Sequence, residues 1–266
     1  VSLLKDQWFL KYSDPEWKEK VKYALSKMKI FPEEARNWFL NTIEWLEDKA
    51  CARKSGLGTP LPWDPSWIVE TLSDSTIYMA FYIVSKFVNL KLINYENLKE
   101  EFFDYVFLGI GDLYEVSKKC NVNPELLAKI REEFNYWYPV DLRASAKDLL
   151  PNHLTFYIYH HVALFDERYW PRMIQVNGMV NIEGQKMSKS KGNVLSIDEV
   201  VGKYGADALR LYLSLSAEGL DDCNWQSEGI NALCNNLSNF YSFCIKIIKL
   251  ENIEKPTELD KWLLSV

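Results

Sequence analysis

The first fifty residues have apolar side chains at the three- and four-residue spacing of two amphipathic helices. Ser13 and Glu16 have the spacing of a capping box, and Pro32 stands where a second helix would begin. The predicted buried face of the first helix consists of Trp17, Val21, Ala24, Leu25 and Met28. That of the second consists of Ala35, Trp38, Phe39, Thr42, Trp45 and Leu46. Residues 1–50 are therefore predicted to form a helical segment.

The pattern changes between Cys51 and Pro65, where glycines and prolines exclude a continuous helix. Leu57, Leu61 and Trp63 are interspersed among them. Because these side chains are apolar, we expect a packed and shaped loop rather than a flexible linker.

From residue 67 to residue 180 strands alternate with helices, which is the recurring unit of α/β nucleotide-binding folds. The predicted strands lie at 67–72, 139–143 and 172–180, the last one broken at Asn177-Gly178. The polar run 73–75 predicts the cap of a helix from residue 76, and a second, apolar helix is predicted at 150–165 after a turn at 146–148. Residues 89–138 are rich in Glu and Lys at helical spacing and are interpreted as a helical insertion.

The last part of the chain is predicted to be helical. Ser196 and Glu199 form a capping box, Gly205 ends that helix, and an amphipathic pattern runs on from Ser227. The chain is therefore divided into a helical segment at 1–50, an α/β half-domain at 51–195 and a helical region at 196–266.

Composition describes a soluble globular chain, with 48% hydrophobic and 26% charged residues among 266. The net charge of −6 gives no support for a stand-alone nucleic-acid binder, so any RNA contact would need a local patch of cations. Lys18, Lys22 and Lys203 are candidates for such a patch, although a solvated helix face is the better interpretation of the first two.

Cysteine usage indicates a reducing cytoplasm, because the five cysteines form no CxxC pair and are odd in number. No metal site is predicted. No apolar run is long enough to span a membrane. The chain begins at Val1 rather than Met and ends at Val266 within a helical pattern, so we expect it to be a piece of a longer protein.

The most informative polar stretch is Lys186-Met187-Ser188-Lys189-Ser190, which continues as Lys191-Gly192-Asn193. It lies between a predicted strand and a predicted helix start. Lysine ammonium groups together with small residues that let the backbone approach a ligand are suited to a polyphosphate. A solvated surface loop is the usual alternative for a generic run of Lys and Ser.

This stretch resembles the KMSKS signature of class I aminoacyl-tRNA synthetases at all five positions. With several further segments, the chain resembles a leucyl-tRNA synthetase of the archaeal or eukaryotic-cytosolic type, in the part that follows the editing insertion. The matching segments are 6–10, 56–59, 62–64, 72–79, 147–149, 152–155 and 176–193. The resemblance implies the second half of a Rossmann-like catalytic domain with a helical insertion, followed by a helical region that leads to the anticodon-binding bundle.

The resemblance also implies a reaction and its participants. In this family the leucine carboxylate attacks the α-phosphorus of ATP, with Mg²⁺, and the leucyl group then passes to tRNA(Leu) in protein biosynthesis. Lys186 and above all Lys189 would neutralise the charge that develops on the pyrophosphate side. Met187, Ser188 and Ser190 would belong to the same ATP-binding loop, whose hydroxyl residues shape it. Asn193 would tether its far end.

Five further residues are assigned to ligands by the resemblance. Asp148 would accept the ribose hydroxyls of ATP, or else cap the following helix, and Ala146 would lie beside the adenosine. Ser75 and Tyr78 match the leucine pocket, and His153 would meet the amino acid or the adenylate. Core packing is the alternative for Tyr78 and His153.

Two departures from the family pattern bear on activity. Ala146 replaces the usual glycine, and no His-x-Gly-His occurs in the chain. We therefore expect the chain alone to be inactive. A diverged paralogue that binds tRNA without activating leucine is one alternative, and a synthetase for isoleucine or valine is another. The segments 56–59 and 72–79 favour leucine.

Overall fold

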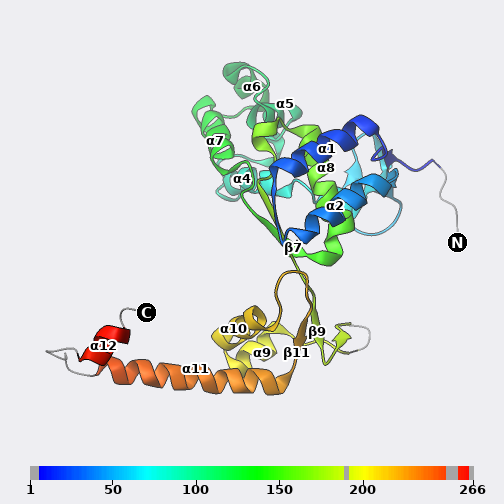
Figure 1. Ribbon diagram of the computed structural model, residues 1–266. Helices are drawn as coiled ribbons and strands as arrows, with labels where there is room; N and C mark the ends of the chain where they lie inside the picture. The colour runs from blue at the N-terminus through cyan, green and yellow to red at the C-terminus, as the bar shows by residue number, and fades with distance from the viewer. Residues whose placement is uncertain (1–5, 189–191, 250–256, 264–266) are drawn as a thin grey trace. The chain divides into compact units, whose positions relative to one another are not determined.

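The computed structural model describes residues 6–188, 192–249 and 257–263 (Figure 1). The chain divides into two compact units, Val1–Gly178 and Met179–Val266, so the unit boundary follows Asn177-Gly178, where the predicted third strand is broken. The division into parts at 1–50, 51–195 and 196–266, made from the sequence pattern, stays a prediction.

A parallel sheet organises the first unit. It has the order β2-β8-β7, and both neighbouring pairs are parallel. Its strands are β2 (Lys29–Phe31), β8 (Met173–Asn177) and β7 (Arg143–Ala146). The predicted α/β fold with parallel strands is thus confirmed. The strand predicted at 139–143 is wrong in position, because pairing with β8 begins only at Arg143. Pro139 has no N–H with which to extend the ladder.

Three helices pack together beside this sheet, as α1 contacts both α2 and α8. They are α1 (Pro15–Lys27), α2 (Glu34–Trp45) and α8 (Thr155–Leu164). The predicted stripes are confirmed for the side chains buried in the two N-terminal helices. Those side chains are Val21, Ala24, Leu25, Ala35, Phe39 and Thr42.

Two predicted details of these helices are wrong. Asp14 rather than Ser13 caps α1, because its carboxylate accepts the N–H groups of Glu16 and Trp17, whereas Ser13 donates to Asp48. In α2 the two tryptophans predicted to be buried are largely exposed, 46% for Trp38 and 54% for Trp45, whereas Phe39 and Ile43 face the core. Aromatic size alone did not identify the buried face.

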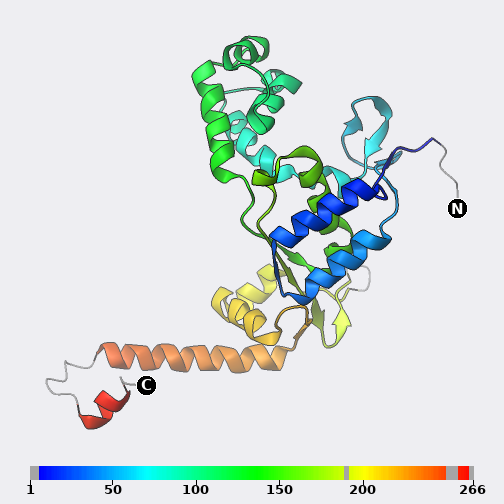
Figure 2. The same ribbon diagram turned by 45° about the horizontal axis from the view of Figure 1, so that its top comes forward.

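Two small antiparallel sheets and a short helix, α3 (Thr71–Asp74), lie in the part of the unit before α4 (Tyr78–Asn89). One sheet pairs β1, which precedes α1, with β3, and the other has the order β4-β6-β5 and is light blue to cyan in Figure 2. They are β1 (Phe9–Leu10), β3 (Lys49–Ala50), β4 (Ala52–Arg53), β5 (Pro60–Leu61) and β6 (Asp64–Val69).

The segment at 51–65 is shaped, as expected, but only part of it is packed. Leu61 is buried, whereas Leu57 is 95% exposed and Trp63 is 63% exposed, so their predicted packing is wrong. The predicted cap at 73–75 is also wrong. Those residues belong to the end of α3, and α4 begins after Ile77 without a side-chain cap.

The predicted helical insertion is confirmed. It comprises α5 (Glu100–Phe103), a π-turn η2 (Asp104–Leu108), α6 (Leu113–Cys120) and α7 (Pro124–Trp137), preceded by a 3₁₀ turn η1 (Tyr95–Asn97). These elements share one core with α4, in which Phe87, Phe102 and Phe134 are fully buried. Helix α4 therefore links the insertion to the rest of the unit.

The second unit has a small sheet with the order β10-β9-β11 and four helices in the described ranges. The strands are β9 (Val180–Ile182), β10 (Gln185–Lys186) and β11 (Cys223–Trp225). The helices are α9 (Ile197–Tyr204), α10 (Ala206–Ser216), α11 (Ser227–Ile248) and α12 (Glu258–Leu263). Ser196 and Glu199 form the predicted capping box with both of its bonds, and Gly205 ends α9.

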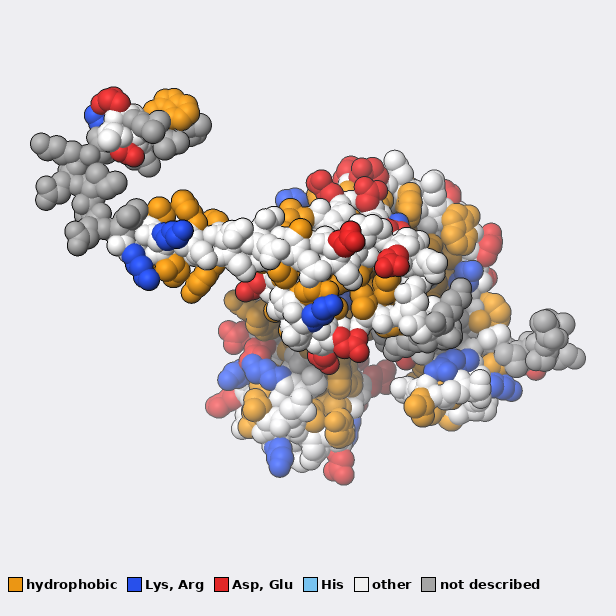
Figure 3. Space-filling view, turned by 90° about the horizontal axis from the view of Figure 1, so that it is seen from below, with side chains coloured by type: hydrophobic (Ala, Val, Ile, Leu, Met, Phe, Trp, Pro, Cys, Tyr) orange, Lys and Arg blue, Asp and Glu red, His pale blue; other side chains and the backbone are white. Residues whose placement is uncertain are grey.

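Helix α11 confirms the amphipathic pattern predicted from Ser227. Its buried residue is Ile230, while Phe240, Tyr241 and Phe243 are exposed, and Figure 3 shows apolar side chains around its far end. Within the described residues, no helix combines the length and the apolar character needed to cross a membrane.

Candidate functional site

In the second unit, the stretch 186–193, called the lysine loop from here on, begins on the hairpin of β9 and β10. Lys186 pairs with Asn181 across this hairpin and is exposed to solvent. Further on, the N–H of Ser188 donates to the carbonyl oxygen of Asn193 at 3.0 Å, which closes the two ends of the loop on each other. Lys189 and Ser190 lie outside the described residues.

Gly192 lies at the closing end of the loop with a φ of +69° and open space where a Cβ would stand. An L-residue rarely adopts this backbone conformation, so the loop needs glycine here for its turn rather than for lack of room. Asn193 is half-buried and uses its backbone carbonyl for the bridge. The sequence motif thus specifies a closed loop by backbone geometry.

In the first unit, Asp148 follows the carboxyl end of β7, within a 3₁₀ turn η3 (Lys147–Leu149). Its side chain is exposed, and Asn152 donates to its backbone carbonyl at 3.1 Å. The next element is the π-turn η4 (Leu150–Leu154), whose N-cap residue, Leu149, makes no side-chain hydrogen bond. Asp148 therefore does not cap the following helix, which was the alternative role for its carboxylate.

Ala146 is the last residue of β7 and pairs with Asn177 of β8. Its φ of −85° and ψ of 156° are ordinary extended values that any residue adopts. The fold itself therefore does not require glycine at this position. If the methyl group of Ala146 lowers activity, it does so through contact with a bound ligand.

Tyr78 and His153 are brought together by Arg143, a residue that the sequence analysis did not single out. The Nη1 of Arg143 donates to the Tyr78 hydroxyl at 2.7 Å, and its Nη2 lies 3.3 Å from Nε2 of His153. The guanidinium also lies over the Tyr78 ring, at 5.6 Å from the centroid. The three residues come from α4, β7 and η4, so the cluster forms only in the folded unit. Its one sequence signal was a cation at the end of the strand predicted at 139–143.

Burial governs the charge states in this cluster. The pKa of His153 is lowered, mainly because burial disfavours the imidazolium and then because the Arg143 cation is close. A hydrogen bond with the backbone of Leu72 acts in the opposite direction. Burial raises the pKa of Tyr157 well above its ordinary value. The Tyr157 hydroxyl and Nε of Arg143 are buried without a hydrogen-bond partner among the described residues.

Ser75 lies near this cluster in sequence but makes a different contact. It terminates α3, and its hydroxyl donates to the carbonyl of Thr71 at 2.9 Å. Of the three residues assigned to the leucine pocket, two therefore share one hydrogen-bonded cluster, while Ser75 bonds within its own helix.

The two remaining histidines are part of the core. His160 lies 2.9 Å from the Tyr12 hydroxyl and 2.6 Å from the Thr76 hydroxyl. His161 lies 3.1 Å from the Tyr138 hydroxyl and is fully buried. Desolvation lowers the pKa of each imidazole to about 4. Both are neutral hydrogen-bonding groups at neutral pH.

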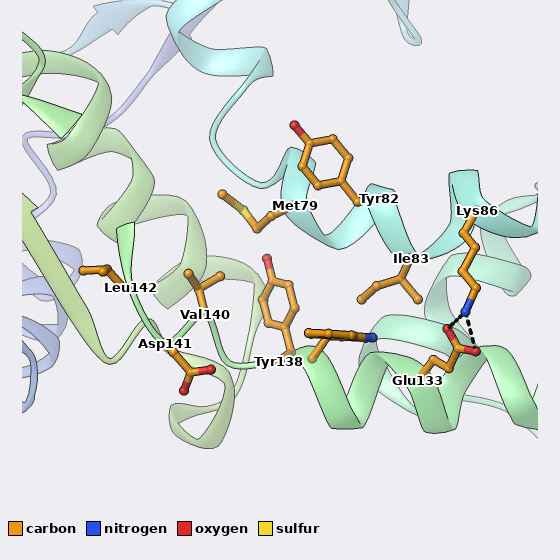
Figure 4. Close-up of a pocket in the computed structure, with 10 residues that line it drawn as sticks. Met79, Tyr82, Ile83, Lys86, Glu133, Tyr138, Val140, Asp141 and Leu142 are labelled. Carbon is orange, nitrogen blue, oxygen red and sulfur yellow. Dashed lines mark hydrogen bonds and ion pairs between the residues drawn. The ribbon is translucent and has the colours of Figure 1, made fainter. Parts of the chain in front are cut away.

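A hollow of about 640 Å³ lies between α4 and α7, next to the segment that leads into β7 (Figure 4). An ion pair of 2.7 Å between Lys86 and Glu133 marks one side of it, and Tyr82, whose ring is 5.3 Å from that of Tyr78, lies on its wall. The residues predicted for the leucine pocket do not line it.

Two of the lysines proposed for RNA contact, Lys18 and Lys22, lie in the first unit and interact with residues of that unit. Lys18 donates to the carbonyl of Glu44 at 2.8 Å, and Lys22 pairs with Glu19 and Glu44. Lys203, in the second unit, lies over the ring of Tyr204. The solvated-face interpretation of Lys18 and Lys22 agrees with these contacts.

The chain matches the family model described as tRNA synthetases class I (I, L, M and V) over residues 118–226. It is 52% identical to the leucine–tRNA ligase of Methanosarcina barkeri and 51% identical to that of Archaeoglobus fulgidus. In both comparisons 100% of this chain is aligned, but it spans only 28% of the relative.

The fold is similar to that of Mycobacterium tuberculosis methionyl-tRNA synthetase in complex with methionyl-adenylate, with a TM-score of 0.61. That match covers 97% of this chain and 45% of the other at 20% sequence identity. The free state of the same enzyme gives a TM-score of 0.58. These likenesses place the α/β fold with its helical insertion among those of class I synthetases.

Proposed function

The chain belongs to the class I tRNA synthetases and corresponds to a segment of leucine–tRNA ligases, and from this we propose that it supplies the second half of a leucine-activating catalytic domain. The observation that carries the proposal is an identity of about 50% to leucine–tRNA ligases along the whole chain, including an intact Lys186-to-Ser190 motif. Isoleucine and valine enzymes are not favoured, because the similar proteins named above are leucine enzymes and methionine is named only at 20% identity.

Lys186 and Lys189 are proposed to stabilise the transition state of leucine activation. When the leucine carboxylate attacks the α-phosphorus, negative charge moves onto the departing pyrophosphate. Ammonium groups aimed at that charge lower the barrier more than they strengthen substrate binding. The bridge between Ser188 and Asn193 supports this role, because it brings the two ends of the motif together through backbone atoms.

Asp148 is proposed to bind the ribose of ATP. Its exposed carboxylate follows the carboxyl end of a parallel strand, where ligands of open α/β sheets bind. ATP and Mg²⁺ are general to the family. Among the described residues no group of three metal-ligating side chains exists, so the residues present do not form a protein-held magnesium site. We assign no step to the metal, which typically enters such sites coordinated by substrate phosphates and water.

Tyr78, His153 and Ser75 are proposed to line the leucine pocket. Tyr78 presents a half-buried aromatic ring, and His153 is buried and neutral at physiological pH. An aliphatic side chain is recognised mainly by shape, at about 1–3 kcal/mol per methylene, so rigid walls determine how well leucine is separated from its analogues. The partners proposed for the whole protein are leucine and tRNA(Leu), in the cytoplasm.

A diverged protein that binds tRNA without activating leucine is the second candidate. The replacement of glycine by Ala146 is the observation that favours it. The extended backbone at Ala146 counts against a folding defect there and restricts the question to ATP contact.

The test is leucine-dependent exchange of pyrophosphate into ATP by the full reading frame that encodes this chain. We expect exchange with leucine, and at least about tenfold less with isoleucine or valine. Equal exchange with all three amino acids would contradict the leucine pocket. No exchange, together with retained binding of tRNA(Leu), would favour the second candidate.

A further inference from the structure

We propose that Arg143 is a positioning residue of the amino-acid pocket, which holds Tyr78 and His153 in one arrangement through the two ends of its guanidinium group. The identity of the pocket's ligand rests on the function proposed above. The arrangement of the three side chains does not. None of the sequence motifs or comparisons assigned a role to Arg143.

The geometry of the contact is specific to arginine. Nη1 reaches the Tyr78 hydroxyl at 2.7 Å while Nη2 reaches His153 at 3.3 Å, so the planar fork serves two elements at once. A lysine ammonium is a single point charge on a flexible stem, and it cannot reproduce two fixed donor directions. The fork therefore sets the distance between α4 and η4 at this point.

The contact also fixes the tautomer of His153. Arginine is a donor only, so Nε2 of His153 must accept, and the neutral ring then has its proton on Nδ1. The backbone of Leu72, on α3, also favours a protonated ring, since it raises the pKa of His153. Through its two contacts, Arg143 thus joins η4, β7 and α4.

The cluster has features that a purely structural ion pair lacks. In the described part of the chain no carboxylate pairs with Arg143, and its Nε is buried without a partner. The hydroxyl of Tyr157 is also buried and unpartnered, within electrostatic range of Arg143 and Tyr78. Arg143 is half-buried, and it directs its guanidinium donors to a tyrosine hydroxyl and a neutral imidazole rather than to a carboxylate.

Neutral His153 is the expected consequence. The groups that face it are Arg143 on β7, the backbone of Leu72 on α3 and His160 on α8, whose own pKa His153 helps to lower. With the Arg143 cation in place, a second positive charge on His153 is disfavoured. Removing the cation should therefore let His153 take up a proton at a higher pH than before.

The direct test is nitrogen NMR of the chain labelled with ¹⁵N only in histidine. The chain has three histidines, and His153→Gln identifies the signals of interest. We expect His153 to show a protonated Nδ1 and an unprotonated Nε2 at pH 8, and to take up a second proton only below the ordinary pKa of 6.5. In Arg143→Gln the two tautomers should mix and the ring should titrate at higher pH. A protonated Nε2 or mixed tautomers in the unsubstituted chain would overturn the proposal.

The matched control is Arg172→Gln. Arg172 lies just before β8, where it pairs with exposed Asp141, so its loss removes an arginine without touching the cluster. The His153 signals should be unchanged in this variant. If Arg143→Gln fails to fold, Arg143→Lys and Tyr78→Phe decide: the lysine variant should lose the single tautomer, and the phenylalanine variant should retain it.

Kinetics of the full reading frame test the role in the pocket. Arg143→Lys should raise KM for leucine by about tenfold or more, while KM for ATP changes by less than about twofold, because the fork shapes only the amino-acid side. Equal losses for both substrates, or none, would overturn the positioning role. If the unsubstituted protein does not activate leucine, the proposed function fails, and the NMR arms still decide whether Arg143 orders His153.

Discussion

The Arg143 cluster of the first unit and the lysine loop of the second differ in burial, charge and hydrogen bonding. His153 is 6% exposed and its Nε2 is bonded to Arg143, whereas Lys186 is exposed at the edge of a hairpin. The cluster is held by side chains from elements distant in sequence, and the loop is closed by one backbone bridge over six residues. The first arrangement is suited to defining a shape, and the second to placing mobile positive charge.

This difference separates the two tasks that an activating enzyme must perform. Discrimination among aliphatic amino acids requires a rigid pocket, since each methylene contributes only about 1–3 kcal/mol to the difference in binding free energy. Acceleration requires charge that acts on the transition state more than on the substrate. We therefore expect substitutions in the cluster to change substrate binding and selectivity, and substitutions in the loop to change the rate.

The largest expected difference between the units concerns acid stability. All three histidines lie in the first unit, and burial lowers the pKa of His160 and His161 from 6.5 to about 4. Below pH 6.5 the unfolded chain therefore binds more protons than the folded unit does. The stabilisation that comes from these two neutral histidines is fully present above pH 6.5 and is lost as the pH falls toward 4. The unfolding constant of this unit should rise about 10³-fold or more over that window.

Hydrogen exchange at pH 7 and pH 4.5 measures this for each unit separately. The second unit, Met179–Val266, has no histidine and should lose less protection. Equal loss in both units would show that the buried histidines do not control acid unfolding.

The next largest effect is expected at the lysine loop. Lys189→Ala should lower kcat of leucine activation by about 10²–10³-fold with little change in KM for leucine, as for the loss of one transition-state donor. Pyrophosphate exchange by the full reading frame measures both constants. Lys203→Ala is the control, because Lys203 is an exposed lysine of the same unit that contacts the ring of Tyr204. A similar loss in the control would remove the specific role of the loop.

A smaller effect is expected in the cluster. Tyr78→Phe leaves the ring but removes the acceptor for Arg143, and should raise KM for leucine by about three- to tenfold, the cost of one charge-assisted hydrogen bond. Tyr82→Phe is matched to it, as Tyr82 is an exposed tyrosine one helical turn away on α4. If Tyr78→Phe lowers kcat and leaves KM for leucine unchanged, the division of tasks between the two regions is wrong.

The smallest effect is expected from Ala146→Gly at the adenosine side, where Asp148→Ala serves as the comparison. Ala146→Gly should tighten ATP binding by a few-fold, and Asp148→Ala should weaken it by about tenfold, the loss of hydrogen bonds to a charged group. ATP titration of the full reading frame gives both values. Because Ala146 has ordinary extended dihedral angles, replacing it with glycine should improve neither the fold nor the stability of the chain. If neither variant changes ATP affinity, the ribose site lies elsewhere.

Local patterns were enough to predict most of the helices, the capping box at Ser196, the helical insertion and the third strand up to its break at Asn177. They did not predict β2, which lies in the segment expected to be helical. The start of β7 at Arg143, the exposure of Trp38 and the cap at Asp14 were not predictable in this way, because each depends on which neighbour reaches the segment in the folded unit. Arg143 is the clearest case. Its partners are 65 and 10 residues away, and neither spacing carries a local signal.

The account depends most on the claim that this chain supplies one half of a leucine-activating centre, which leucine-dependent pyrophosphate exchange tests directly. The 266-residue chain should be measured alone and then together with the preceding segment of the Methanosarcina barkeri leucine–tRNA ligase. We predict no exchange by the chain alone and exchange by the mixture, abolished by Lys189→Ala. Exchange by the chain alone would contradict the account, and so would a mixture whose exchange is indifferent to Lys189.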